Sequence, residues 1–310
     1  MESKQKFIID TDIGDDIDDA FALLLAMKLN LDIIGVTTVF RNTDERARIA
    51  KLIMKKYGNG YENVPIYAGY STPLAKNDEK YPHTCQYTDE LSSDNLAPES
   101  TDPDNAVSFI IDSCKKYGKD LTLIAIGPFT NVAKAIEKDR DALALAGKVV
   151  IMGGAYFRQY VDWNIACDVE AAQIMYSGLD NIHCLGADVT HQLRLTDEND
   201  QAVCSTESGN AEKYVSELYR LWKMQSHSIG ILHDPLAIYY SIDTSICETV
   251  SAPIALITDG FAKGITLNVK EYNKAYMNKA YESFDLSHTH ILARTVDREK
   301  MLKIFMKCFE

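Results

Sequence analysis

The spacing of apolar residues predicts strands that alternate with helices along the chain. Short apolar runs with the length of buried strands recur, and stretches with helical spacing of apolar positions lie between them. The strand-like runs cover residues 7–9, 33–39, 64–67, 121–126, 148–152, 182–185 and 254–258. The helical patterns cover residues 18–29, 44–57, 105–116, 131–138, 169–176, 212–224 and 298–309. This alternation predicts an α/β fold with a parallel sheet and helices on both faces.

The length and composition favour a single domain over residues 1–310. A chain of 310 residues with 46% hydrophobic content buries a large core, and no linker rich in Gly, Ser or Pro interrupts it. Residues 76–105 are polar, rich in Asp, Ser and Pro, and longer than an ordinary connection. This stretch is either a surface excursion or a lid, and the sequence leaves both interpretations open.

The segment FIIDTDIGDDIDDAFALLLAM, residues 7–27, places a group of aspartates directly before an apolar helical pattern. They are Asp10, Asp12, Asp15, Asp16, Asp18 and Asp19. Carboxylates this close repel one another unless a cation neutralises them, so the segment indicates a hard, oxygen-ligated metal ion at the carboxyl end of a strand. The alternative is an acidic, helix-capping loop without metal. An EF-hand fits poorly, because its sixth and twelfth loop positions would hold Asp15 and Phe21.

Further polar residues follow other predicted strands. Asn42 comes after the run 33–39, Asn131 lies in GPFTN after 121–126, and Asp162 and Asn164 follow the run 148–152. His233 begins the segment HDPLA. Each residue taken alone has an ordinary structural explanation, such as shaping a turn or capping a helix. Their occurrence in this order after the aspartate group favours one shared site.

That ordered set resembles the nucleoside hydrolase family, the inosine–uridine-preferring nucleoside N-ribohydrolases, over nearly the whole chain. The family hallmark is an amino-terminal DxDxxxDDA motif, which stands here as Asp10-Thr11-Asp12 followed by Asp18-Asp19-Ala20. The spacing is two residues longer than the shortest family pattern. Alignment from the DDA end matches Asp12, Asp18 and Asp19 to the functional aspartates. Whether Asp15 or Asp16 also enters the site stays open.

The resemblance implies a doubly wound, mostly parallel open α/β sheet that holds one Ca²⁺ at the bottom of a ribose pocket. The implied metal ligands are Asp12, Asp19, the backbone carbonyl of Ile126 and Asp234. A main-chain ligand tolerates an isoleucine, because the side chain plays no part.

The resemblance also implies the residues that bind the ribose. Asp18 and Asp234 would contact the hydroxyls, and Asn42 and Asn164 would add hydrogen bonds. Asp162 stands where family members commonly have Glu, which shortens its reach toward the 5′ side of the ribose. Arg41 occupies a place usually held by Gly, and we expect it to crowd or charge the mouth of the pocket.

The expected reaction is calcium-dependent hydrolysis of the N-glycosidic bond of ribonucleosides, as in purine and pyrimidine nucleoside catabolism. Because this cleavage passes through an oxocarbenium-like cation, it needs nearby negative charge, a positioned water and a proton for the departing base. Asp12 is the expected general base and His233 the expected acid. Trp222 is the aromatic residue that we expect to stack on the base, and we assign His191 a structural role. The sequence does not decide the base preference.

Composition excludes other partners and predicts the compartment. The net charge of −13 argues against nucleic acid, which binds basic surfaces, and no run of residues is long enough to span a membrane. The seven cysteines are scattered without a CxxC pair, and the amino terminus lacks the pattern of a signal peptide. We therefore expect reduced thiols, a cytoplasmic location and a homo-oligomer, either a dimer or a tetramer.

Two other classes of protein remain open at this point. A metal-dependent phosphohydrolase would use Asp10 as nucleophile and Asp12 as acid and base, but it leaves HDPLA unexplained. A catalytically weak riboside-binding protein would explain the departures at Arg41 and Asp162. Release of free base from a nucleoside panel, measured beside phosphate release, separates the three.

Overall fold

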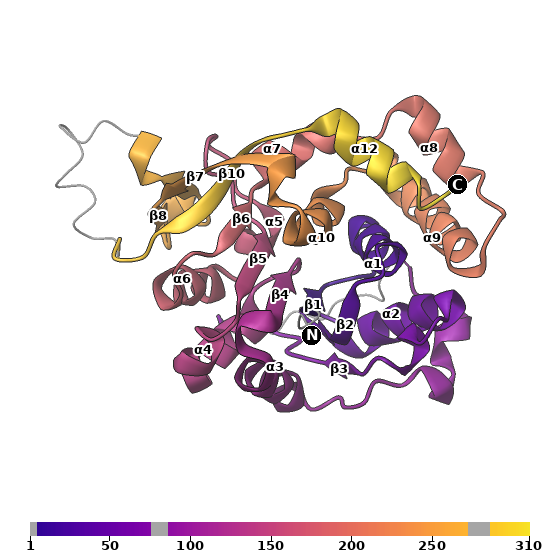
Figure 1. The fold of residues 1–310 in the computed structure, drawn as a ribbon, viewed down its shortest axis with the longest axis horizontal. Coiled ribbons are helices and arrows are strands. Elements are labelled where there is room, and N and C mark those ends of the chain that lie inside the picture. Colours follow the sequence, from indigo (N-terminus) through magenta and orange to yellow (C-terminus); the bar gives the residue numbers. More distant parts are fainter. Residues whose placement is uncertain (1–4, 76–85, 272–285) are drawn as a thin grey trace.

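The computed structural model describes residues 5–75, 86–271 and 286–310, and its main element is an eight-stranded sheet (Figure 1). The strand order is β3-β2-β1-β4-β5-β6-β10-β7, and neighbouring strands are parallel in every pair except β10 and β7. The strands are β1 (Lys6–Thr11), β2 (Asp32–Thr38), β3 (Ile66–Ala68), β4 (Leu121–Ala125), β5 (Lys148–Met152), β6 (His183–Leu185), β7 (Cys247–Ala252) and β10 (His290–Val296). The predicted open, mostly parallel α/β sheet is confirmed.

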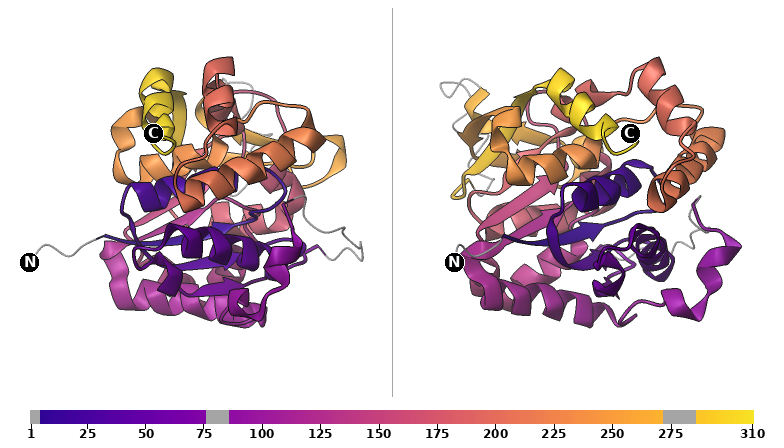
Figure 2. Two further views of the ribbon diagram at one scale, coloured as in Figure 1. Left: turned by 90° about the vertical axis from the view of Figure 1, so that its right-hand side faces the viewer. Right: turned by 45° about the vertical axis from the view of Figure 1, so that its right-hand side comes forward.

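Helices cover both faces of the sheet, as two further views make clear (Figure 2). One buried apolar cluster includes α1 (Asp18–Lys28), α2 (Thr43–Tyr57), α9 (Asn210–Ser226), α10 (His233–Ile242) and α12 (Arg298–Met306). The other includes α3 (Pro103–Tyr117), α4 (Thr130–Leu143) and α6 (Val169–Gly178). Shorter helices are α5 (Trp163–Cys167), α7 (Ala187–Thr190) and α8 (Asp197–Cys204).

The direction of winding reverses between β1 and β4. Strands β2 and β3 extend the sheet on one side of β1, whereas β4, β5 and β6 extend it on the other. At such a point the connections after neighbouring strands run to opposite faces, which opens a crevice at the carboxyl ends of the strands. The aspartate group follows β1 and therefore lies at this crevice.

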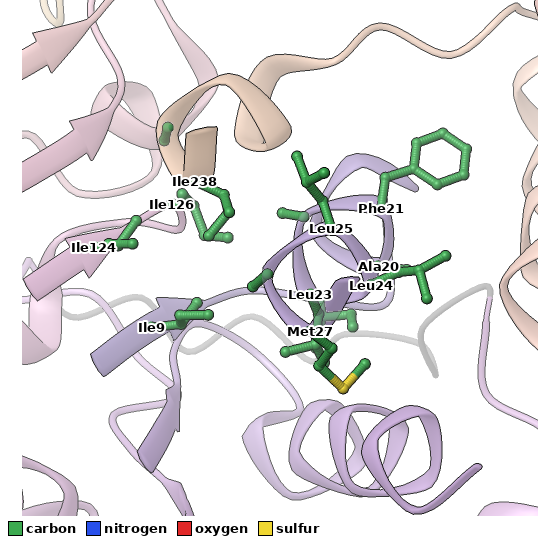
Figure 3. Packing of buried hydrophobic residues seen from close by; sticks show 14 of the residues in the cluster. Ile9, Ala20, Phe21, Leu23, Leu24, Leu25, Met27, Ile124, Ile126 and Ile238 are labelled. Atoms are coloured by element: carbon green, nitrogen blue, oxygen red, sulfur yellow. The ribbon is translucent and has the colours of Figure 1, made fainter. Parts of the chain in front are cut away.

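Helix α1 is buried on every side except at its carboxyl end, because its sequence DDAFALLLAMK is apolar all round after the first two residues. Phe21 and Leu24 project from one side of it into the cluster, and Ile9 and Ile238 lie on the other side (Figure 3). Complete burial of one such side chain stabilises a protein by about 1.5–3 kcal/mol. This packing holds the first turn of α1, with Asp18 and Asp19, in a fixed position.

One predicted strand was placed wrongly and several elements were missed. The run 254–258 was expected in the parallel sheet, but β8 (Ile254–Leu256) pairs antiparallel with β9 (Thr266–Asn268) in a separate two-stranded sheet. Strands β7 and β10, which complete the main sheet, and helices α5, α7, α8 and α10 were not predicted. Strand β7 lies on an antiparallel edge and buries only its two end residues, so it lacks the continuous apolar run by which buried strands are found.

Other expectations bear on the surface of the molecule. In the polar stretch 76–105, residues 76–85 lie outside the described part, and the remainder forms the short helices η2 (Asp89–Ser92) and η3 (Asp94–Leu96) before α3. Six cysteines are free thiols in the described chain, and Cys85 lies outside it. Among the helices that the structure describes, none has the length and apolar character to cross a membrane.

Candidate active site

A cavity of about 370 Å³ lies at the crevice between β1 and β4. It takes residues from the carboxyl ends of β1, β4 and β5 and from the first turns of α1, α5 and α10. Its lining residues are Asp12, Asp15, Asp16, Asp18, Asp19, Ile126, Met152, Tyr160, Asp162, Trp163, Asn164, Ala187, His191, Trp222, His233 and Asp234. Nine of the ten residues predicted for the site are in this list.

Two helix amino termini bring the acidic residues together. Asp18 and Asp19 are the first residues of α1, and His233 and Asp234 are the first residues of α10, which packs beside α1. The free backbone N–H groups and the positive end of the helix dipole favour carboxylates at these positions. The segment HDPLA is therefore the start of a helix, with Pro235 in the first turn, where proline is tolerated.

Asp18, Asp19 and Asp234 form a buried carboxylate cluster in which one oxygen of each lies within 4.8 Å of the others. Burial raises the pKa of all three well above the usual range, and the neighbouring carboxylates raise each pKa further. The Thr11 hydroxyl donates a hydrogen bond to Asp19. Three anionic oxygen donors without nitrogen or sulfur are the donor set that a hard divalent cation takes. The residues present therefore fit such an ion.

The other two predicted metal ligands line the same cavity outside this cluster. Burial raises the pKa of Asp12 to about 6, while the nearby guanidinium of Arg46 opposes the rise. The backbone carbonyl of Ile126 accepts a hydrogen bond of 2.7 Å from the side-chain amide of Asn164. Asp18, which was expected to bind ribose, completes the cluster where Asp12 was expected. The assignment of Asp12 and Ile126 as ligands stays a prediction.

Asp162 and Asn164 are held by the first turn of α5. The Asp162 carboxylate caps this helix by accepting a hydrogen bond from the Ile165 backbone at 3.3 Å, and burial raises its pKa to about 6. Asn164 also donates to the backbone carbonyl of Met152 at 3.1 Å. Its amide therefore ties the ends of β4 and β5 together beneath the cavity.

His233 lies in a row of rings that ends at the cavity mouth. Its Nδ1 is 2.5 Å from the Thr190 hydroxyl, and its ring centre is 5.2 Å from that of His191. The ring of Tyr160 is in turn 5.4 Å from His191. Burial, with a contribution from His191, lowers the pKa of His233 to about 3, which opposes the protonated state that a general acid needs. His191, to which we assigned a structural role, lines the cavity.

Aromatic side chains surround the outer part of the cavity. Trp222 projects from α9 and stacks on Tyr219, with ring centres 5.8 Å apart and planes 19° apart. Trp163 is 56% exposed and Tyr160 is 44% exposed, although both line the cavity. Large apolar rings left open to solvent beside a polar pocket are suited to stack on a flat ligand. Tyr160 was not predicted, because nothing near it in the sequence distinguishes it from other surface tyrosines.

Asn42 is the one predicted site residue that the structure does not bring to the cavity. It precedes α2, and its backbone carbonyl accepts from the backbone of Arg46 at 3.0 Å. The sequence showed only that it follows β2, and the turn that begins α2 directs the chain away from the lining.

Asp10 is also absent from the lining. It is fully buried, and its Oδ1 accepts hydrogen bonds from Thr37 at 2.5 Å and Asn131 at 2.7 Å. This position argues against Asp10 as the nucleophile of a phosphohydrolase.

The two additional aspartates of the β1–α1 loop both line the cavity and have different partners. The Asp15 carboxylate lies 2.8 Å from Arg46 Nη2 and 3.4 Å from Arg41 Nη1. Asp16 accepts from the backbone of Ile17 at 2.6 Å. Arg41, expected at the pocket mouth, lies with its guanidinium 5.6 Å from the ring centre of Trp163.

Comparisons with known proteins agree on one family. Residues 7–303 match the family model described as inosine-uridine preferring nucleoside hydrolase. The chain is 30% identical to uridine nucleosidase 1 of Arabidopsis thaliana, with 96% of this chain and 91% of that protein covered. It is 29% identical to the inosine-uridine preferring nucleoside hydrolase of Crithidia fasciculata, with 85% and 87% covered.

Solved structures give the same result. A plant nucleoside hydrolase superposes with a TM-score of 0.80 at 26% identity, covering 99% of both chains. The purine-preferring ribonucleoside hydrolase from Gardnerella vaginalis superposes with a TM-score of 0.77 at 26% identity, covering 98% of both.

Proposed function

The chain belongs to the inosine-uridine preferring nucleoside hydrolase family and is a nucleoside N-ribohydrolase, and we propose that it works with Ca²⁺ and with Asp12 as its general base. The observation that carries this proposal is that Asp12, His233 and the cluster of Asp18, Asp19 and Asp234 line the same cavity. The reaction yields ribose and a free base.

The acidic lining suits the transition state of N-glycosidic cleavage. As the bond to the base breaks, positive charge develops on the ribosyl ring, and fixed negative charge beside the ring lowers the energy of that state. Asp12 accepts the proton of the water that attacks C1′. Burial raises the pKa of Asp12 to about 6, and a cation bound beside it would lower that pKa, so the carboxylate is ionised at neutral pH and free to accept a proton.

We propose that the metal ligands are Asp12, Asp19, the Ile126 carbonyl and Asp234, with Asp18 beside them. Their oxygen-only chemistry and their burial support a hard divalent cation, and the family is metal-dependent. When bound, Ca²⁺ would neutralise part of the carboxylate charge, hold ribose hydroxyls and lower the pKa of a water.

His233 is the proposed donor of a proton to the departing base. The Thr190 hydroxyl fixes the imidazole by its Nδ1, which leaves Nε2 for the substrate. Because burial keeps the imidazole of His233 neutral, donation requires that bound substrate raise the pKa of His233. Trp222 is the proposed stacking partner of the base, and Asp18, Asp162 and Asn164 are the proposed ribose contacts within the cavity.

A nucleoside panel tests this function. Purified protein with measured calcium content is incubated with uridine, cytidine, inosine and adenosine, and free base is quantified by chromatography. The 2′-deoxy counterparts are the matched controls, since they lack a hydroxyl that the site is proposed to hold. We expect base release from at least one ribonucleoside and much slower release from its deoxy counterpart.

Two results would overturn the proposal. Phosphate release from nucleotides without base release would indicate a phosphohydrolase. Tight binding of ribonucleosides without release of any base would indicate a riboside-binding protein. Uridine and inosine are the first substrates to test, because similar proteins carry those names.

We also propose a cytoplasmic location and a homo-oligomer. The free thiols of the six described cysteines support a reducing compartment. Light scattering coupled to size-exclusion chromatography distinguishes a monomer from the dimer or tetramer.

A further inference from the structure

Arg46 is the largest fully buried side chain in the described part of the protein. It projects from α2, and its guanidinium donates hydrogen bonds to the loop after β1, which lines the cavity, and to the loop after β2. Nε donates to the Phe40 carbonyl at 2.7 Å, and Nη1 donates to the carbonyls of Asp12 and, at 3.0 Å, Ile13. Nη2 pairs with the Asp15 carboxylate at 2.8 Å.

These contacts clamp Asp12 from one side, and Gly127 closes the other side. A Cβ at Gly127 would lie 2.9 Å from both the backbone nitrogen and Oδ1 of Asp12, so the chain after β4 packs directly on this residue. The backbone of Asp12 is thus fixed at its carbonyl by a guanidinium and at its nitrogen by a neighbouring loop. The fixed backbone, together with the close approach of Gly127 to Oδ1, restricts the directions open to the carboxylate.

A buried guanidinium needs a counter-ion and full hydrogen bonding. Asp15 supplies the charge, and it also pairs with Arg41 at 3.4 Å. Two arginines therefore share one carboxylate at the cavity edge. Asp16 has a different environment, because Gln86 donates to its backbone carbonyl at 2.5 Å and its carboxylate caps the turn at Ile17. The two added aspartates are not equivalent.

We propose that Arg46 is a positioning residue for Asp12, and that Asp15 is the counter-ion of Arg46 and not a ligand of the metal. The first part rests on the proposed role of Asp12 as general base. Arg46 acts through the backbone of Asp12, whereas Asp15 keeps the guanidinium in place. In this arrangement the longer β1–α1 loop supplies, through Asp15, the carboxylate that neutralises the Arg46 guanidinium.

Four variants test the proposal: Arg46→Lys, Arg46→Met, Asp15→Asn and the control Arg48→Lys. Arg48 is a matched control on the same helix, since it also contacts one carboxylate and two backbone carbonyls, at Asp44, Leu91 and Ser93, away from the cavity. Each variant is measured for thermal midpoint, calcium affinity by chelator competition, amide hydrogen exchange over residues 12–19, and kcat and KM for the best nucleoside.

Lysine keeps the charge of Arg46 but cannot reach three carbonyls and a carboxylate at once. We expect Arg46→Lys to lower kcat by about tenfold or more, with KM within about threefold, and Arg46→Met to lower kcat further. Exchange over residues 12–19 should become faster in both. Arg48→Lys should keep kcat within about twofold. Asp15→Asn should lower kcat by a few fold and leave calcium affinity within about threefold.

Equal kcat values for Arg46→Lys and Arg48→Lys would overturn the positioning role. A loss of calcium affinity of about tenfold or more in Asp15→Asn would make Asp15 a ligand and overturn the second part. If both Arg46 variants fail to fold, Asp15→Asn alone tests the positioning role of Arg46. An unchanged kcat in Asp15→Asn then refutes that role. If the wild type releases no base, the proposed function fails by itself, whereas calcium affinity and hydrogen exchange still test the clamp and its counter-ion.

Discussion

Replacing Asp234 with Asn should stabilise the metal-free protein and destabilise the calcium-bound protein relative to wild type. The carboxylate is 98% buried, at the start of α10, and its oxygen lies within 4.8 Å of those of Asp18 and Asp19. Burial raises the pKa of Asp234, and the charges of these two neighbours raise it further. Without a cation, the folded chain must either hold the charges together or protonate one of them.

The magnitude follows from these two options. Two unit charges 4.8 Å apart repel by about 3.5 kcal/mol at an effective dielectric constant of about 20. A carboxyl of ordinary pKa costs about 4 kcal/mol to protonate at pH 7. Because the folded chain can always protonate one carboxyl, this cost is the upper limit of the destabilisation by repulsion. The substitution also removes a favourable charge at a helix amino terminus, worth about 0.3–1 kcal/mol. The net gain is about 2–3 kcal/mol, or roughly 3–5 °C in Tm for a chain of this size.

The assay is a thermal melt in EGTA and in excess Ca²⁺. Wild type should gain about 2.7 kcal/mol at a calcium concentration of about 100 times Kd, and Asp234→Asn should gain much less. Asp162→Ala is the matched control, because this buried carboxylate caps α5 and its removal should lower Tm in both buffers, by about 0.5–2 kcal/mol of stability. A lower Tm for Asp234→Asn than for wild type in EGTA would refute the repulsion.

Three further substitutions test the reaction. Asp12→Asn should lower kcat by about 10²–10⁴-fold with little change in KM, and near wild-type turnover in a calcium-replete sample would exclude Asp12 as the base. His233→Ala should reduce hydrolysis of ordinary nucleosides by about 10²–10⁴-fold. It should spare p-nitrophenyl riboside, because that leaving group departs as an anion. Equal losses on both substrates would make the residue structural. Trp222→Ala should raise KM for the preferred nucleoside by about 2–10-fold and lower Tm slightly, because the stacking on Tyr219 is lost, and an unchanged KM would remove it from the base site.

The sequence alone determined the features that depend on local order. Apolar spacing located β1, β2, β4, β5 and the long helices to within a few residues, because burial imposes a period on each element. The aspartate group indicated a cation site because like charges so close in the chain remain close in any fold. Resemblance then supplied HDPLA and Asp162, and both reach the cavity.

Tertiary structure decided which of those residues meet. Asp18 joins Asp19 and Asp234 because α1 packs beside α10, a contact between segments far apart in the chain that no local pattern encodes. His191 lines the cavity and Asn42 does not, although both follow predicted strands in the sequence.

The role of Arg46 was equally hidden in the sequence, where an arginine in the polar pattern of α2 reads as a solvated residue. Its side chain is buried only because the longer loop after β1 folds over it and offers two carbonyls and the Asp15 carboxylate. Apolar periodicity records how much of an element is buried, whereas the pairing of polar groups across elements depends on where the finished fold places them.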